Sequence, residues 1–164
     1  MQKLEFVESR IFTNWDNLKY WLAYWKFHEK KVVFTNGCFD LLHQGHIDYL
    51  ATAADKGDVL IIGLNTDASI TRLKGNGRPV QDERSRALLL SSLRFVDAVV
   101  LFDQDTPYEL IKLVKPDVLV KGSDYNAEDI VGYDIVTENG GDVVTVDYLD
   151  GFSTSGLIKQ IKAI

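Results

Sequence analysis

Short apolar runs alternate with segments of helical spacing along most of the chain. The runs cover residues 32–35, 58–65, 98–102, 117–120 and 142–147, and most of them lack a regular alternation of polar and apolar residues. Strands that helices cover on both faces have this pattern. We therefore predict an α/β fold with a doubly wound, mainly five-stranded parallel Rossmann-like sheet and right-handed crossovers.

The helices are predicted from apolar spacing and from capping signals at their ends. Asn14 is a candidate N-cap for a helix over about 14–30. Further helices are expected over about 45–56, 82–93, 107–114, 133–139 and 153–164. Residues 66–79 are expected to be a polar connection, and residues 1–13 show no clear pattern beyond that of an extended arm. We interpret residues 1–164 as a single domain, with an added N-terminal helix and a core from about residue 31.

The N-terminal helix is expected to present two apolar faces. The face that should pack on the rest of the domain consists of Leu18, Trp21, Leu22 and Trp25. The roughly opposite face consists of Tyr20, Tyr24 and Phe27. Tyrosine tolerates partial exposure, so the second face is either partly exposed or a contact in a homodimer.

The net charge and the cysteine count limit which partners the protein can bind and indicate the cellular compartment in which it works. The net charge of −6 argues against a nucleic-acid-binding protein. It also means that an anionic ligand must be held by a local group of cations. The single cysteine, Cys38, excludes an internal disulfide and fits a reducing compartment such as the cytoplasm. We find no signal peptide and no apolar run long enough to span a bilayer, so we expect no membrane association.

The chemistry is concentrated in residues 32–46, with the sequence VVFTNGCFDLLHQGH. His43 and His46 lie where a predicted strand gives way to a helix, which is the usual place for a ligand in an open α/β sheet. A helix N-terminus there suits an anion, and two imidazoles can add hydrogen-bond donors. Two solvated histidines are the plain alternative. A zinc site of the HExxH type is excluded, because the spacing and the glutamate are missing.

Other polar residues are predicted at the same edge of the sheet, each with an ordinary alternative. Lys74 and Arg78 follow the second strand and suit phosphate oxygens, or they belong to a solvated basic loop. Lys121 and Asp124 follow the fourth strand, as ligand contacts or as part of a turn. Ser153, Thr154 and Ser155 open the last helix, as a second phosphate seat or simply as its cap. Arg84 and Arg86 lie in a helix, where a surface position is the plain interpretation.

These motifs resemble those of the HxGH nucleotidylyltransferases, which are related to the cytidylyltransferases. NGCFDLLHQGH is similar to their signature G-x-F-D-x-x-H-x-G-H, and the likeness extends over nearly all of residues 31–163. RLKGNGRPV and VKGSDY resemble motifs of the branch that makes nucleotide-activated heptoses. GFSTSG resembles the cytidylyltransferase motif I-S-T-T-K, with Gly156 in place of its lysine. Arg84 replaces a glutamate that the family usually has.

The resemblance implies an adenylyltransferase that moves AMP from ATP onto a sugar 1-phosphate, namely heptose 1-phosphate, and releases pyrophosphate. The alternatives are a cytidylyltransferase that acts on an alcohol phosphate such as glycerol 3-phosphate, and an FMN adenylyltransferase. Mg²⁺ is expected chiefly on the phosphates of the nucleotide, with no metal site built from protein side chains. A sugar kinase on a separate chain is the implied pathway partner.

The resemblance also implies roles for individual residues. His43 and His46 would bind the triphosphate and stabilise its transition state, and Lys74, with Arg78, would neutralise the acceptor phosphate or the α-phosphate. Arg86 and the helix start at residues 153–155 would hold the departing phosphates. The nucleotide crevice would be shaped by Asn36, Gly37 and Phe39, with Gly45 leaving room for close approach and with Lys121 and Asp124 at the base or ribose. Asp40 would either bind Mg²⁺ or orient His43.

Overall fold

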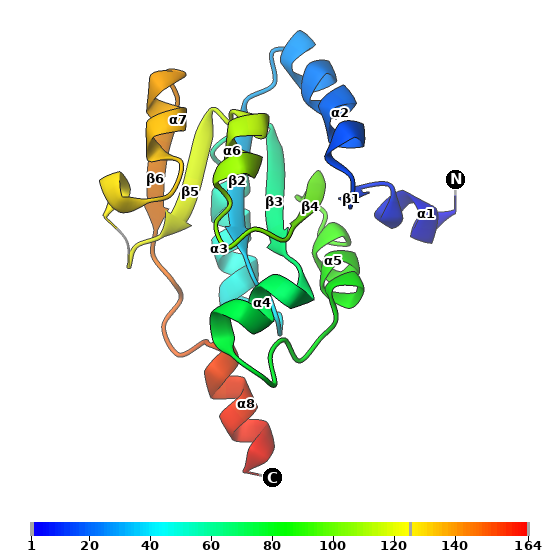
Figure 1. The fold of residues 1–164 in the computed structure, drawn as a ribbon, viewed down its shortest axis with the longest axis vertical. Helices are drawn as coiled ribbons and strands as arrows, with labels where there is room; N and C mark the ends of the chain where they lie inside the picture. The colour runs from blue at the N-terminus through cyan, green and yellow to red at the C-terminus, as the bar shows by residue number, and fades with distance from the viewer. Residues whose placement is uncertain (1, 125, 164) are drawn as a thin grey trace.

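The computed structural model describes residues 2–124 and 126–163 and contains a sheet of six parallel strands (Figure 1). The strands are β1 Ile11–Phe12, β2 Val32–Gly37, β3 Val59–Asn65, β4 Ala98–Phe102, β5 Val118–Gly122 and β6 Asp142–Val146. Their order in the sheet is β1-β4-β3-β2-β5-β6. The chain winds from β2 through β3 to β4 and then crosses back to β5 on the other side of β2. The switch in winding direction therefore lies between β2 and β5, where such sheets bind ligands at their carboxyl edge.

Helices cover both faces of this sheet. They are α1 Lys3–Glu8, α2 Trp15–Phe27, α3 Gln44–Ala54, α4 Asp67–Lys74, α5 Glu83–Ser91, α6 Tyr108–Val114, α7 Tyr133–Glu138 and α8 Thr154–Lys162, with a short 3-10 turn at Ala127–Asp129. One core cluster joins α2, α6 and α7 to the sheet, and the other joins α3 and α5 to it. Figure 1 shows α8, in red, projecting beyond the carboxyl ends of the strands.

The central strands are apolar on both faces because both faces are buried. All seven residues of β3 are buried. Phe34 and Ile61 belong to the cluster on one face, whereas Val33 and Ile62 belong to the cluster on the other. This alternation follows from the two-residue period of a strand. It confirms the predicted α/β class and the doubly wound parallel sheet.

The sixth strand lies in the N-terminal segment, where the sequence showed no clear pattern. β1 forms an edge of the sheet and pairs with β4 through Ile11 and Phe12, opposite Val99 and Val100. Phe12 is buried there, and Arg10 donates from Nη1 to the carbonyl of Val96 at 2.9 Å. Two residues are too few to show a period, so this strand could not be recognised from the sequence.

The prediction that residues 66–79 form a polar connection is wrong, because its first part is the helix α4. Thr66 caps that helix by accepting a hydrogen bond from the backbone N–H of Ser69 at 3.2 Å. Ile70 is fully buried and fixes the helix to the core. The helix ends at Gly75, whose φ of 85° suits glycine. Because α4 is mostly polar and Ile70 is its one large buried apolar residue, its sequence lacks the apolar spacing by which a helix is recognised.

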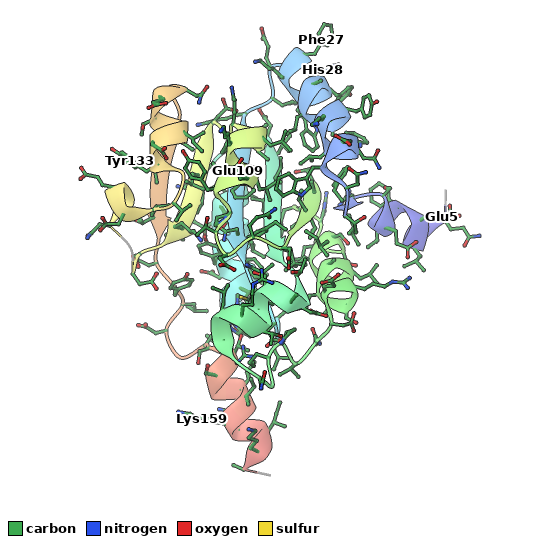
Figure 2. All side chains as sticks on the ribbon, viewed as in Figure 1. Glu5, Phe27, His28, Glu109, Tyr133 and Lys159 are labelled. Carbon is green, nitrogen blue, oxygen red and sulfur yellow. The ribbon has the colours of Figure 1, made fainter. Side chains whose placement is uncertain are left out.

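The helix α2 begins as predicted, with Asn14 accepting from the N–H of Asp16 at 2.8 Å. Leu18 and Trp25 are buried, but Trp21 is 46% exposed, which corrects its assignment to the packed face. The aromatic residues of the second face, Tyr20, Tyr24 and Phe27, are exposed. Figure 2 shows Phe27 at the far end of α2, pointing away from the sheet. Whether this face contacts a second subunit stays a prediction. Within the described part of the chain, no helix has the length and apolar content needed to cross a membrane.

Candidate active site

A cavity of about 330 Å³ lies at the carboxyl ends of β2, β3 and β5, next to the switch in winding direction. Most of the predicted site residues line it, namely Asn36, Gly37, Phe39, Asp40, His46, Lys74, Arg78, Lys121, Asp124 and Thr154. A larger hollow of about 720 Å³ lies at the opposite edge, before β2, β5 and β6, and contains none of the predicted site residues. Most of the predicted site residues thus lie around one cavity at the carboxyl ends of the strands, where ligands of open α/β sheets usually bind.

His43 and His46 act as a pair at the start of α3. His43 is the N-cap, and its Nδ1 accepts from the backbone N–H of His46 at 3.3 Å. An accepting Nδ1 leaves the proton of the neutral ring on Nε2. The two rings stack with their centroids 3.8 Å apart, although His43 is not among the residues that line the cavity.

Both imidazoles are neutral near pH 7. Burial, with smaller effects of the nearby His43 and Lys74, lowers the pKa of His46 to about 4. Burial also lowers the pKa of His43. The Nδ1 atom of His46 is buried and has no hydrogen-bond partner among the described residues. The pair therefore consists of neutral imidazoles, rather than of two positive charges.

Gly45 has a different role from the predicted one. A Cβ atom at Gly45 would lie 3.0 Å from Cβ of Phe152 and 3.2 Å from Nδ1 of His43. The ring of Phe152 stacks on His43, with the centroids 6.3 Å apart. The space beside Gly45 is therefore filled by the loop before α8, and it is not left open for a ligand.

Asp40 is a buried structural clamp, which corrects both roles that were expected for it. Its Oδ2 accepts from Nε of Arg78 at 2.6 Å, and its Oδ1 accepts from the backbone N–H groups of Val80 and Gln81 at 2.7 and 3.1 Å. Burial alone would raise the pKa of Asp40, but these donors outweigh it and lower the pKa below its usual range. The carboxylate is thus occupied in fixing residues 78–81.

Arg86 is also placed differently from the prediction, because its side chain is fully buried in the wall behind the cavity. Its Nη1 donates to the carbonyls of Cys38 and Asn65 at 2.7 and 2.9 Å, and its Nε donates to the carbonyl of Gln81 at 3.1 Å. Its Nη2 contacts Asp67 at 2.7 Å. All three guanidinium nitrogens are engaged inside the protein, and Arg86 is not among the residues that line the cavity, which argues against a role in holding the departing phosphates.

The start of α8 reaches the cavity through one of its three predicted residues. Thr154 lines the cavity. Ser153 caps the helix by accepting from the N–H of Gly156 at 3.0 Å, as the plain interpretation had it. Ser153 and Ser155 lie outside the cavity lining. Because Phe152 stacks on His43, the N-terminus of α8 nevertheless lies close to the histidine pair.

Basic and polar groups enter the cavity from two sides. Lys74 and Arg78 come from the segment after β3, whereas Lys121 and Asp124 come from the end of β5. Burial lowers the pKa of Lys121 to about 8, although Asp124 and Cys38 favour its charged form. Asn36 lines the cavity, and its Oδ1 is buried without a hydrogen-bond partner among the described residues.

Four lining residues were not predicted as site residues: Cys38, Tyr49, Asn65 and Tyr148. Asn65 ends β3, so the rule of strand ends could have found it. Tyr49 lies three residues after His46 and hence on the same face of α3. Tyr148 follows β6 in an irregular segment, and no pattern in the sequence indicates that it folds back over the cavity.

The described residues hold no group of three or more His, Cys, Asp or Glu side chains that could bind a metal ion. Asp40, which was expected either to bind Mg²⁺ or to orient His43, already accepts three hydrogen bonds. These residues do not fit a metal held by the protein itself.

A parallel Rossmann-like sheet, a crevice at its switch point and a histidine pair at a helix start define the class of nucleotide-binding α/β enzymes. The family model named cytidylyltransferase-like matches residues 34–150, and the chain belongs to this family. The sequence resemblance is thereby confirmed, and the protein is a nucleotidyltransferase.

Individual relatives agree with this assignment. The bifunctional protein HldE of Campylobacter curvus is 60% identical over 134 residues, which cover 82% of this chain and 28% of the relative. HldE of Nitrobacter hamburgensis is 51% identical over 154 residues, covering 94% of this chain and 32% of the relative. The chain thus spans less than a third of the length of these relatives.

Solved structures resemble the chain as well. The lipopolysaccharide core biosynthesis protein of Thermoplasma volcanium is 31% identical, with a TM-score of 0.58, and the match covers 73% of this chain and 97% of that one. Pantoate-beta-alanine ligase of Francisella tularensis has a TM-score of 0.63 at 14% identity, and covers 94% of this chain and 78% of that one. At that identity the second match supports the fold alone.

Proposed function

We propose that the protein transfers AMP from ATP to a heptose 1-phosphate and releases pyrophosphate. The observation that carries the proposal is the shared cavity of His46, from the HQGH loop, and Lys74, from the heptose-type loop RLKGNGRPV. The names of the relatives, HldE and a lipopolysaccharide core biosynthesis protein, support the choice of a heptose substrate. The chain matches less than a third of each HldE relative, so the similarity supports only the reaction that the matched region could catalyse.

In the proposed reaction, an oxygen of the sugar phosphate attacks the α-phosphorus of ATP in line. A new P–O bond forms, the bond between the α-phosphorus and the bridging oxygen breaks, and the electron pair leaves with pyrophosphate. The attacking phosphate oxygen is already a nucleophile, so no protein nucleophile is required. Positioning and charge stabilisation are what the enzyme must supply.

We assign the residues to the two substrates from their places in the cavity. His46, supported by the stacked His43, donates to the triphosphate near the N-terminus of α8. Lys74 and Arg78, on the β3 side, neutralise the acceptor phosphate. Lys121, on the β5 side, contacts the nucleotide. Mg²⁺ enters bound to the phosphate oxygens of ATP, and none of these assignments depends on a protein ligand to it.

The proposal is tested by product analysis with each nucleotide and each acceptor class. ATP or CTP is mixed with heptose 1-phosphate, glucose 1-phosphate, glycerol 3-phosphate or FMN, and the products are identified by mass spectrometry, with pyrophosphate followed through a coupled pyrophosphatase. We expect ADP-heptose and pyrophosphate from ATP and heptose 1-phosphate only. Efficient use of CTP with glycerol 3-phosphate, or of ATP with FMN, while heptose 1-phosphate is inert would overturn it.

The same experiment extends to the proposed partner. A sugar kinase on a separate chain would supply the heptose 1-phosphate, since the reaction requires an acceptor that already carries a phosphate. A coupled assay with the free heptose alone should then give no ADP-heptose, and addition of a kinase that phosphorylates its anomeric hydroxyl should restore the product. Product without any kinase would show that the acceptor is not the 1-phosphate.

A further inference from the structure

Three aromatic side chains line the cavity, and they differ in how much of each ring a ligand can reach. Phe39 is 7% exposed, and its ring lies against Gly37 and His46. Tyr49 is 4% exposed, and its hydroxyl bonds to Thr35 and to the carbonyl of Val120 at 2.8 and 3.2 Å. Tyr148 is 51% exposed. Tyr148 is thus the cavity ring with a large accessible surface.

Tyr148 is held in place by the end of the neighbouring strand. It follows β6 by two residues and folds back over Gly122, the last residue of β5. A Cβ atom at Gly122 would collide with Cε2, Cζ and Oη of Tyr148. The ring also packs beside Tyr49, with the centroids 5.5 Å apart and the planes tilted by 30°. The position of Tyr148 therefore requires a residue without a side chain at Gly122.

The segment after β6 connects the two ends of the cavity. Its Phe152 stacks on His43, at the end proposed for the phosphates. Its Tyr148 lies at the β5 end, on the other side of the cavity from the segment that carries Lys74. A nucleoside has a planar base that gains from an aromatic platform, typically about 1–3 kcal/mol per base. A sugar phosphate has no such group.

We propose that Tyr148 is the stacking platform for the nucleobase and that Gly122 seats it. This inference rests on the proposed function and adds the residue that binds the base. Gly122→Ala should act through Tyr148, because the colliding atoms are the far end of a side chain that can swing away. The strand itself should survive, since Gly122 lies in regular β structure.

The test measures binding of ATP and of inorganic tripolyphosphate by calorimetry, without an acceptor. Tripolyphosphate has the phosphates but no base. For Tyr148→Ala we expect the Kd of ATP to rise about 5- to 150-fold, and the Kd of tripolyphosphate to stay within about twofold. Tyr148→Phe keeps the ring and should bind ATP like the wild type. Gly122→Ala should weaken ATP binding, and the double variant should be no weaker than Tyr148→Ala, because the two changes remove one interaction.

The outcomes separate this inference from the proposed function. A wild-type protein that binds ATP while Tyr148→Ala binds it equally well overturns the platform and leaves the function standing. Equal losses for ATP and tripolyphosphate also overturn it, because they indicate a general change of the loop. Additive losses in the double variant refute the seating role of Gly122. A wild-type protein that binds no nucleotide overturns the proposed function and the platform together.

Discussion

Replacing Arg86 with methionine should destabilise the protein strongly. The guanidinium is fully buried, and it bonds to three backbone carbonyls and to Asp67. Methionine has a similar length but no donors, so three carbonyls lose their partner in the interior. Removing one side of a buried charged network typically costs about 3–5 kcal/mol. Since a small domain has a total stability of about 5–15 kcal/mol, the loss should be plain in urea denaturation.

Arg84 provides the matched control, because it lies in the same helix two residues earlier. Its side chain is 78% exposed, and its contact to Glu8 spans 3.3 Å. Exposed pairs of this kind contribute about 0–1 kcal/mol, so Arg84→Met should leave the urea midpoint almost unchanged. Arg86→Lys keeps the charge but loses the planar fork that reaches several acceptors, and it should fall between the wild type and Arg86→Met.

The same variants separate an internal anchor from a phosphate ligand. If Arg86 held the departing phosphates, Arg86→Lys would be nearly as stable as the wild type and would lose turnover. The structure predicts the reverse order, with loss of stability first and loss of turnover as its consequence. Equal urea midpoints for the Arg86→Met and Arg84→Met proteins would refute the anchoring role.

Three further predictions address the histidine pair, the pH profile and the exposed face of α2 formed by Tyr20, Tyr24 and Phe27. His46→Ala should cut turnover by about 10²-fold or more, the scale for a lost charge-stabilising donor, while circular dichroism shows an intact fold; near-normal turnover would reject the assignment. Because burial lowers the pKa of Lys121 to about 8, its cation is present below that pH and lost above it, so kcat/KM for ATP should fall on the alkaline side. In Lys121→Met that alkaline limb should be missing, and an unchanged limb would assign it to another group. If the exposed face contacts a second subunit, the triple variant Tyr20→Ser, Tyr24→Lys and Phe27→Ser should shift the protein towards monomer in light scattering. A wild-type protein that is monomeric at high concentration would refute this contact.

The fold was predictable wherever a local run of apolar residues shows that a segment is buried. β3 is buried along its whole length, so its apolar run could be read without any tertiary information. The helix α4 failed the same test because only Ser69 and Ile70 are buried in it. The edge strand β1 failed because its stability comes from pairing with β4, a partner almost ninety residues away.

Site residues at strand ends were predictable by position, but their chemical roles depended on distant partners. Asp40 was expected either to bind Mg²⁺ or to orient His43. Its partners are the backbone of residues 80–81 and Arg78, which no local window contains. Arg86 was interpreted as a surface residue or a phosphate ligand, because its partners also lie outside any local stretch of sequence. A buried charge is recognised only by what surrounds it.

These long-range partners converge on the loop after β2, and this convergence explains how a short motif becomes a precise site. The carbonyl of Cys38 accepts from α5, the carboxylate of Asp40 fixes residues 78–81, and His43 packs against the segment before α8. Each contact comes from a different element, so the loop is restrained from several sides at once. Catalysis by positioned donors requires such restraint, because the groups must not reorganise as charge develops. The sequence NGCFDLLHQGH thus contains the imidazole donors, and contacts from the rest of the chain hold them in place.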